Sequence, residues 1–377
     1  MQYRTFGTLD WKPSALGFGA MRLPTLNDDP AQIDEPEATR MIRHAIDHGV
    51  NYIDTAYPYH NEASEPFVGR VLQDGYREKV KLATKMPAWL VKEWNDFDRY
   101  LDEQLERLQT DHVDFYLLHG LGAARWDKLQ ELKVLDWAEG ALADGRIKYL
   151  GFSFHDHLDA FKSIVDAYAW TFCQIQLNYM DIEYQAGVEG LKYAAGKGLA
   201  VVVMEPLRGG RLAKEPPESV ARLWAQAETQ HSPTDWALQW VWHHPEVSLL
   251  LSGMSTMQHV EENLASAGRS APNSLSATEL ALIDQVRQAY EALAPIPCTQ
   301  CRYCMPCPNG VNIPRILDIY NKAVMYGDVH GARVSYTFVD EAERADHCVA
   351  CGECEAACPQ HIEIITWLEK AHEILAK

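Results

Sequence analysis

The chain has 377 residues, of which 47% are hydrophobic and 23% charged, as is typical of a folded globular protein. Its 53 acidic and 34 basic residues give a formal net charge of −19, which disfavours nucleic acid as a partner. No run approaches the ~18 apolar residues of a membrane span. The N-terminal residues 1–7 contain no apolar signal segment, so we expect a cytoplasmic protein.

Residues 3–11 predict a short hairpin that turns at Gly7, and from residue 14 onward strands alternate with helices. The predicted strands cover residues 14–20, 50–54, 80–85, 113–119, 147–153, 174–178, 199–204 and 247–251. The predicted helices cover residues 37–48, 65–72, 96–108, 127–144, 157–168, 188–196, 220–228, 234–243 and 260–267, with a further helix at 277–293. About eight such β–α units favour a closed parallel (β/α)8 TIM barrel over an open doubly wound sheet.

The repeating pattern ends at Pro295-Ile296-Pro297, and no β–α unit follows it. Beyond this point cysteine-rich loops are separated by helical stretches at residues 313–326 and 364–376. We therefore predict two domains, a barrel at residues 1–293 and a small, mostly α-helical domain at residues 294–377.

Four ionisable side chains stand at or just beyond the ends of three consecutive predicted strands: Asp54, Tyr59, Lys85 and His119. A barrel of this kind brings the carboxyl ends of its strands together, so these groups are candidates for one site. A lysine cation lowers the pKa of a neighbouring phenol, and a carboxylate holds the lysine charged. Tyr59 can then give a proton to a carbonyl oxygen while His119 donates a hydrogen bond to it.

These residues and their surroundings resemble the aldo-keto reductase superfamily over residues 1–293. The matching segments are residues 51–65, 82–85, 114–119, 147–153, 174–178 and 253–263. The resemblance implies that Asp54, Tyr59, Lys85 and His119 are a catalytic tetrad and that the cofactor is NADPH or NADH. It also implies that Ser153 and Gln174 hold the nicotinamide carboxamide. Further cofactor contacts are expected from Met204, Leu207, Gly209, Gly210 and Asn263.

The chain departs from the family pattern at three places. Phe154 stands where the family usually has asparagine, and Met204 stands where an aromatic ring often stacks on the nicotinamide. Residues 252–259 contain no lysine or arginine to bind an adenosine 2′-phosphate, which leaves NADPH and NADH both open. Arg208 and Arg211 are the nearest cations to the expected pyrophosphate, with a solvated surface role as the alternative. Trp89, just past Lys85, is either a wall of the substrate pocket or a packing residue.

Eight of the nine cysteines lie in two runs within the C-terminal part, and only Cys173, in a predicted strand, stands apart as an expected core thiol. The second run has the C-x2-C-x2-C-x3-C-P spacing of bacterial two-cluster ferredoxins, in which the fourth cysteine binds the other cluster. The first run is one residue shorter between its last two cysteines. We predict two 4Fe–4S clusters, one held by Cys298, Cys301, Cys304 and Cys358 and the other by Cys307, Cys348, Cys351 and Cys354. Zinc bound by four thiolates is the alternative.

Two functions follow from these patterns. The first is an enzyme that reduces a carbonyl compound, or oxidises an alcohol, with NAD(P)H and exchanges electrons through its clusters with a ferredoxin-like partner. The alternative is an electron-transfer or redox-sensing iron–sulfur protein whose barrel binds a cofactor or partner without turnover. Because hydride carries two electrons and a cluster carries one, the sequence leaves the link between the two centres open.

Overall fold

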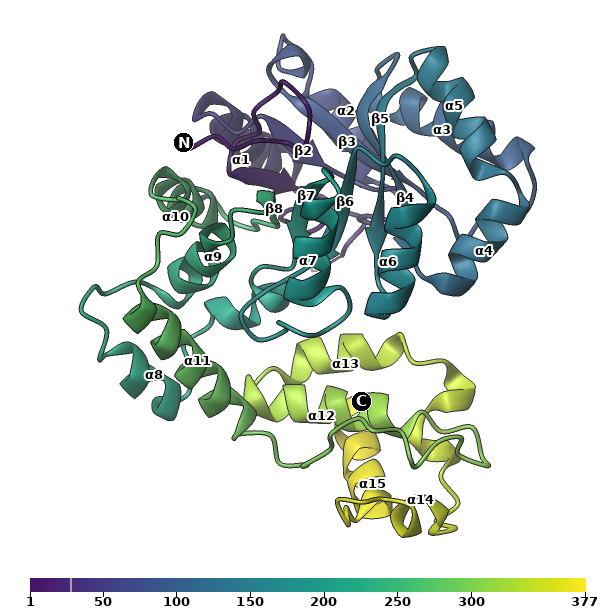
Figure 1. Ribbon diagram of the computed structural model, residues 1–377, viewed down its shortest axis with the longest axis vertical. Coiled ribbons are helices and arrows are strands. Elements are labelled where there is room, and N and C mark those ends of the chain that lie inside the picture. Colours follow the sequence, from purple (N-terminus) through teal and green to yellow (C-terminus); the bar gives the residue numbers. More distant parts are fainter. Residues whose placement is uncertain (28) are drawn as a thin grey trace. The chain divides into compact units, whose positions relative to one another are not determined.

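The computed structural model describes residues 1–27 and 29–377 (Figure 1). It divides into two compact units, one formed by Met1–Ala213 with His231–Ala277 and the other by Lys214–Gln230 with Thr278–Lys377. The second unit therefore includes residues 214–230 as well as the last helix before the cysteines. The domain boundary between residues 293 and 294 stays a prediction.

The first unit is a closed barrel in which each strand pairs in parallel with the next, and β8 pairs with β1 through Leu16 and Leu250. The predicted fold is thus confirmed, with strand ends displaced by at most two residues. The strands are β1 Leu16–Gly19, β2 Tyr52–Asp54, β3 Lys81–Met86, β4 Val113–Leu121, β5 Ile147–Phe154, β6 Phe172–Gln176, β7 Ala200–Met204 and β8 Val247–Ser252.

Helices surround this barrel, as Figure 1 shows. They are α1 Glu35–Asp47, α2 Ser64–Val71, α3 Asn95–Leu108, α4 Ala123–Glu131, α5 Val134–Ala143, α6 Leu158–Ala167, α7 Gly187–Gly196, α9 Pro233–His243 and α10 Met257–Gly268. The single helix predicted at 127–144 is wrong, because Lys133 adopts a left-handed conformation with φ 59° and separates α4 from α5. Local composition gives no signal for this break, since lysine is a good helix former.

The N-terminal hairpin supplies aromatic rings to the barrel interior. Phe6 is fully buried, and its ring centroid lies 4.8 Å from that of Phe115 and 5.8 Å from that of Phe172. Gly7 makes this turn with φ +53°, where an added Cβ would lie 2.7 Å from the carbonyl oxygen of Gly198. Because these rings lie toward the amino ends of the strands, the opposite, carboxyl end is left for chemistry.

The second unit contains helices and no strand among the residues described. Its helices are α8 Glu218–Trp224, α11 Ala277–Glu291, α12 Ile313–Met325, α13 Val329–Thr337, α14 Glu353–Ala356 and α15 Ile364–Leu375. Helix α13 was not predicted. The core includes Ile316, Leu317 and Leu368, and partly buried cysteines pack against it. The mostly α-helical character predicted for this part of the chain is confirmed.

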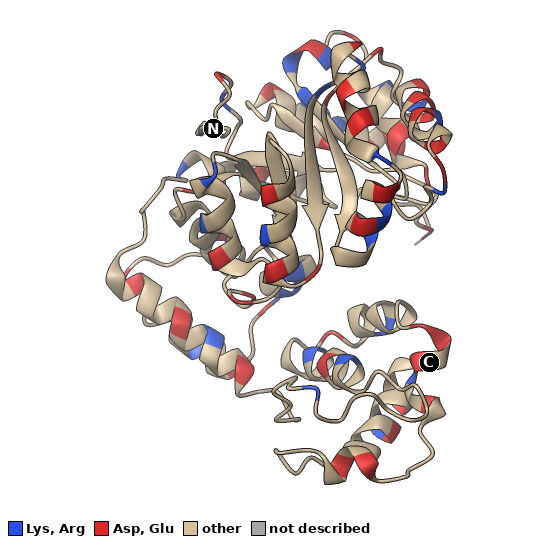
Figure 2. Ribbon diagram, turned by 45° about the vertical axis from the view of Figure 1, so that its right-hand side comes forward, with Lys and Arg blue, Asp and Glu red and all other residues tan. Residues whose placement is uncertain are grey.

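Acidic residues, red in Figure 2, lie on the helices of both units with basic residues, blue, interspersed. This distribution matches the formal net charge of −19. Of the helices in residues 1–27 and 29–377, none has the length and apolar character needed to cross a membrane.

Candidate functional site

Parallel closure of the barrel brings the predicted tetrad to one end of the sheet. Asp54 is the last residue of β2, Lys85 is the penultimate residue of β3, and His119 lies near the end of β4. Tyr59 follows β2 on a loop in which its own N–H donates to the carbonyl of Ala56. The four side chains come from consecutive β–α units, as expected of an active site in this fold.

Lys85 is the centre of this arrangement. Its Nζ donates hydrogen bonds to Asp54 Oδ1 at 2.6 Å, to the carbonyl of Thr55 at 2.8 Å and to Tyr59 Oη at 3.3 Å. The exposed fraction of Lys85 is 1% and that of Asp54 is 2%, so both charges are withdrawn from water. Burial lowers the pKa of Lys85, but Asp54 and Tyr59 together raise it by more, and the pKa lies above the ordinary value. The ammonium is therefore held charged against the phenol.

Burial changes one expectation about Tyr59. Lys85 and its hydrogen bond do lower the pKa of the phenol, as the sequence argument expects, but burial raises the pKa by more and Asp54 adds to the rise. The pKa of Tyr59 consequently lies above its usual value, which corrects the expected net direction. At neutral pH the side chain is a protonated phenol with a cation 3.3 Å from its oxygen.

His119 lies beside Tyr59, with ring centroids 6.3 Å apart and planes at 84°. Burial holds the pKa of this imidazole well below its usual value, and the positive charge of Lys85 lowers it further. The ring is therefore neutral and carries one N–H. Its Nδ1 is buried without a partner among the described residues. The ring of Trp89 lies 5.2 Å from that of His119, so Trp89 borders this group, as one of its two predicted roles requires.

A buried polar layer behind the strands supports Lys85. Gln104 of α3 donates to the carbonyl of Lys85 at 3.0 Å and to Glu65 Oε1 at 2.5 Å. The hydroxyl of Thr84 also donates to Glu65 Oε1 at 2.5 Å. These contacts tie β3 to α2 and α3 and restrict the position from which the lysine side chain projects.

Two buried side chains on β5 and β6 have free hydrogen-bonding capacity that suits a carboxamide. Ser153 Oγ accepts a hydrogen bond from Gly120 N–H at 2.7 Å, and its own hydrogen has no acceptor among the described residues. Among the described residues, Gln174 Oε1 is buried without a partner, and the amide nitrogen of Gln174 has only the sulfur of Met204, at 3.5 Å, as a partner. A carboxamide offers the matching acceptor and donor. The residues present therefore fit a nicotinamide.

The loops after β7 and β8 contain the other residues expected to contact the cofactor. Leu207 precedes the 3₁₀ segment Arg208–Ala213, in which Gly209 and Gly210 have φ of 68° and 91°. Asn263 of α10 is buried and donates to Ser252 Oγ at 2.9 Å, which joins it to the end of β8. All of these residues lie in the barrel unit.

Arg22 is a further cation near these loops, besides the predicted Arg208 and Arg211. Arg208 forms an ion pair with Asp181 at 2.9 Å and is buried, so its charge is already compensated. Arg22, after β1, is exposed and has no ion pair with any described residue. A Cβ added at Gly209 would lie 3.3 Å from Arg22 Nη2, and one at Gly253 would lie 3.2 Å from its Cβ. Arg22 was not predicted from the sequence. It could have been, because polar residues that follow a barrel strand are site candidates and Arg22 follows β1.

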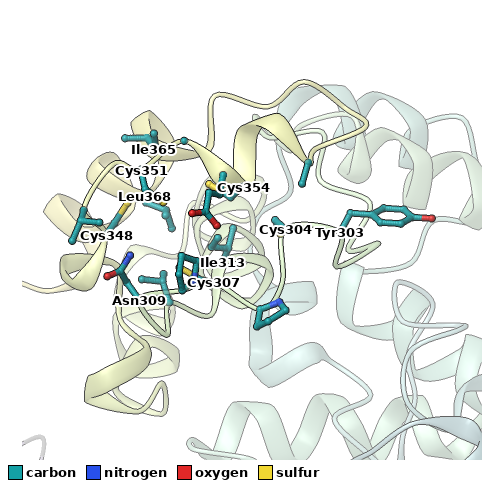
Figure 3. A pocket seen from close by; sticks show the side chains of 17 residues that line it. Tyr303, Cys304, Cys307, Asn309, Ile313, Cys348, Cys351, Cys354, Ile365 and Leu368 are labelled. Atoms are coloured by element: carbon teal, nitrogen blue, oxygen red, sulfur yellow. The ribbon is translucent and has the colours of Figure 1, made fainter.

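The cysteines of the second unit line two cavities. The larger, of about 150 Å³, is lined by Cys304, Cys307, Cys348, Cys351 and Cys354. Figure 3 shows these side chains around one space, with the ring of Tyr303 pointing away from it. The smaller, of about 20 Å³, is lined by Cys298, Cys301, Cys304 and Cys358. Cys304 lines both cavities, and the smaller cavity has only four cysteines including Cys304. If Cys304 belongs to the smaller set, the larger cavity keeps the other four: Cys307, Cys348, Cys351 and Cys354.

The arrangement of these thiols bears on which metal they suit. Within residues 1–27 and 29–377, no three His, Cys, Asp or Glu side chains converge closely enough to hold a single metal ion. A zinc site needs four sulfurs about 2.3 Å from one point. Thiols spread around a cavity instead suit the corners of a cluster, so the residues fit iron–sulfur ligation better than zinc. Cys173 is fully buried in β6 of the barrel unit and lines neither cavity.

A (β/α)8 barrel with these groups at its strand ends, joined to a unit with cysteine-lined cavities, defines an oxidoreductase that carries an iron–sulfur domain. The chain belongs to the aldo/keto reductase family, whose family model matches residues 15–288. A second model, the 4Fe-4S dicluster domain, matches residues 297–363.

Individual relatives agree with this assignment. L-galactose dehydrogenase of Arabidopsis thaliana is 28% identical over 286 residues, covering 70% of this chain and 88% of the relative. The oxidoreductase YrpG of Bacillus subtilis is 30% identical over 234 residues, covering 56% and 68%. Among solved structures, aldo-keto reductase AKR11C1 from Bacillus halodurans (holo form) has a TM-score of 0.63 and 28% identity, covering 76% of this chain and 96% of that chain. An aldo-keto reductase from Klebsiella pneumoniae in complex with NADPH has a TM-score of 0.61, 25% identity and the same coverage.

Proposed function

We propose that the protein reduces an aldehyde or ketone with NADPH or NADH, or oxidises the corresponding alcohol, with Tyr59 as general acid or base. The observation that carries this proposal is the contact of Lys85 Nζ with both Asp54 and Tyr59 at the barrel end where His119 lies. Packing alone does not explain a buried cation held against a phenol, because an apolar side chain would pack better there. It does suit proton delivery.

Each residue of the tetrad has a distinct task in this proposal. The nicotinamide, when bound, supplies the hydride that the carbonyl carbon accepts. Tyr59 gives its phenolic proton to the carbonyl oxygen, and the charge of Lys85 stabilises the phenolate that remains. Asp54 keeps Lys85 charged and in place. His119, neutral because of its burial, donates its ring N–H to the same oxygen and orients the carbonyl.

We assign the cofactor contacts to Ser153 and Gln174 for the carboxamide, and to Met204 beside the nicotinamide ring. The loop residues Leu207, Gly209 and Gly210 and the buried Asn263 complete the expected cradle. The NADPH complex of the Klebsiella pneumoniae relative supports a nicotinamide cofactor. The absence of lysine and arginine from residues 252–259 supports use of NADH as well as NADPH.

For the second domain, residues 294–377, we propose two 4Fe–4S clusters that exchange single electrons with a ferredoxin-like partner. The two lining sets support the predicted ligands, with Cys298, Cys301, Cys304 and Cys358 around one cluster. Cys307, Cys348, Cys351 and Cys354 surround the other. In each set, the ligand just before a proline comes from the opposite cysteine run.

The test is the Tyr59→Phe variant, assayed for NADPH oxidation with a panel of aldehydes and ketones. Loss of a general acid lowers turnover by about 10²- to 10⁴-fold. Tyr57→Phe is the matched control, because that ring lies on the same loop but contacts Glu103 and Arg107 instead of Lys85. Equal turnover by Tyr59→Phe and Tyr57→Phe would remove Tyr59 from the mechanism.

The same preparation separates the alternative, a redox protein without carbonyl turnover. If the protein binds NADPH tightly, reduces none of the carbonyl compounds and changes its visible cluster absorbance anaerobically on NADPH addition, the alternative replaces our proposal. If carbonyl turnover proceeds while the cluster absorbance is unchanged, the clusters take no electrons from this cofactor.

A further inference from the structure

A second cation lies at the carboxyl end of β4, next to the tetrad. Arg125, in the first turn of α4, folds back so that its Nη1 donates a hydrogen bond to the carbonyl of Gly120, the residue after His119. A Cβ added at Gly120 would lie 3.1 Å from that nitrogen, and Gly120 has φ +63°. Glycine at this position therefore leaves the room that the guanidinium occupies beside His119.

Arg125 has no carboxylate partner among the described residues, in contrast to three other arginines of the barrel; the buried Arg4 also lacks an ion pair there and donates instead to the carbonyl of Trp242. Of the residues that the structure describes, none forms an ion pair with it, whereas each of the following has a carboxylate within 2.7–2.9 Å: Arg77, Arg107 and Arg208. Burial lowers the pKa of Arg125, and its charge contributes to the lowered pKa of His119. The guanidinium is thus half-buried, close to the imidazole and uncompensated.

An uncompensated guanidinium in such a place is costly unless a ligand supplies the opposite charge. Arg125 has five N–H donors, and the Gly120 carbonyl uses one nitrogen only. The remaining fork matches the two oxygens of a carboxylate. We propose that the carbonyl substrate carries a carboxylate that Arg125 binds, so that the enzyme prefers aldehydes or ketones bearing an acid group over their neutral analogues.

A singly charged carboxylate fits better than a doubly charged phosphate. Two carboxylates lie on this side. Asp156 accepts a hydrogen bond from the N–H of Ala123 at the start of α4 at 2.8 Å, and Glu205 is an exposed residue after β7 whose negative charge acts on both Tyr59 and His155. Because Lys85 is already paired with Asp54, we assign the ligand's charge to Arg125. One cation near two carboxylates favours a monoanion, since repulsion from Asp156 and Glu205 grows with the charge of the ligand.

This inference rests on the proposed carbonyl reduction and is tested with matched substrates. 3-Carboxybenzaldehyde and 4-carboxybenzaldehyde are compared with their methyl esters, which have the same reacting carbonyl and no charge. We expect Arg125→Gln to lower kcat/KM for the better acid by about 10- to 100-fold, the loss of a charge-assisted hydrogen-bond pair, with the ester unchanged. Arg125→Lys should fall between, because it keeps the charge but not the fork.

Glu205→Gln is the charge control, and it should leave kcat/KM for the acid unchanged or raised. If Arg125→Gln lowers kcat/KM equally for acid and ester, or for neither, the inference is overturned. Reduction of the ester by the wild type would still support the proposed function. Calorimetric titration with the acid tests the anion site independently of carbonyl turnover. Binding that weakens in Arg125→Gln supports the anion site even without turnover, and no binding to the wild type refutes it.

Discussion

Replacing the two buried charges singly and together tests whether Lys85 and Asp54 form one ionised unit. The variants are Asp54→Leu, Lys85→Met and the double variant, in which both charges are exchanged for apolar side chains. All three should lose carbonyl turnover, so the informative quantity is the free energy of unfolding. The pair is suited to this cycle because the two side chains are 1% and 2% exposed and 2.6 Å apart.

The magnitudes follow from the contacts of each group. Asp54→Leu leaves a buried ammonium without a counterion, and Lys85→Met leaves a buried carboxylate without a partner, so each should cost about 3–5 kcal/mol. The double variant has no buried charge. It loses only the hydrogen bonds of Lys85 to the Thr55 carbonyl and to Tyr59, of which the unsatisfied carbonyl costs about 1–3 kcal/mol. The double variant should therefore be more stable than either single one.

The assay is urea unfolding followed by tryptophan fluorescence, to which the fully buried Trp236 and Trp242 of the barrel contribute. Independent sites add to within about 0.5 kcal/mol. If the double variant is destabilised by the sum of the single effects, the two residues are not coupled, and the reasoning that Asp54 holds Lys85 charged is refuted.

Three further predictions concern the protonation states, the cofactor loops and the clusters. Because the pKa of Tyr59 is raised and that of His119 is lowered, kcat/KM for reduction should show no inflection near pH 6.5 and should fall only above pH ~10. Arg22→Ala should raise KM for NADPH by about 2- to 5-fold, the worth of an exposed charge contact, with kcat unchanged. Cys354→Ala should reduce iron from about eight to about four atoms per chain, whereas Cys173→Ala should leave it unchanged.

A specific result would contradict each of these three predictions. An inflection near pH 6.5 that disappears in a His119→Asn variant would mean that the imidazole titrates while the enzyme works. An Arg22→Ala effect on kcat alone would place that side chain away from the cofactor; Arg40→Ala, an exposed pair with Glu37 on α1, is its control. Zinc in place of iron in the anaerobically prepared protein would restore the zinc alternative.

The sequence predicts the barrel and the grouping of the four candidate residues because both depend on local patterns. Apolar runs define the strands, and closure of the barrel then brings Asp54, Lys85 and His119 together without further information. The orientation of Arg125 could not be predicted, because it depends on a side chain folding back over a strand end that only the packed α4 makes available. The net pKa direction of Tyr59 also depends on packing, since burial and the lysine charge act in opposite directions.

The overall charge of the protein constrains how the proposed acid substrate reaches Arg125. A net charge of −19 repels anions at long range, so attraction must come from short-range contact with the half-buried guanidinium. Raising the ionic strength from 0.01 to 0.1 M shortens the Debye length from about 30 to about 10 Å, which screens the surface charges while affecting a partly buried contact much less. With saturating cofactor, kcat/KM for the carboxybenzaldehyde should therefore rise with salt, and that for its methyl ester should stay constant. A fall with salt for the acid alone would show that exposed cations, and not Arg125, attract the carboxylate.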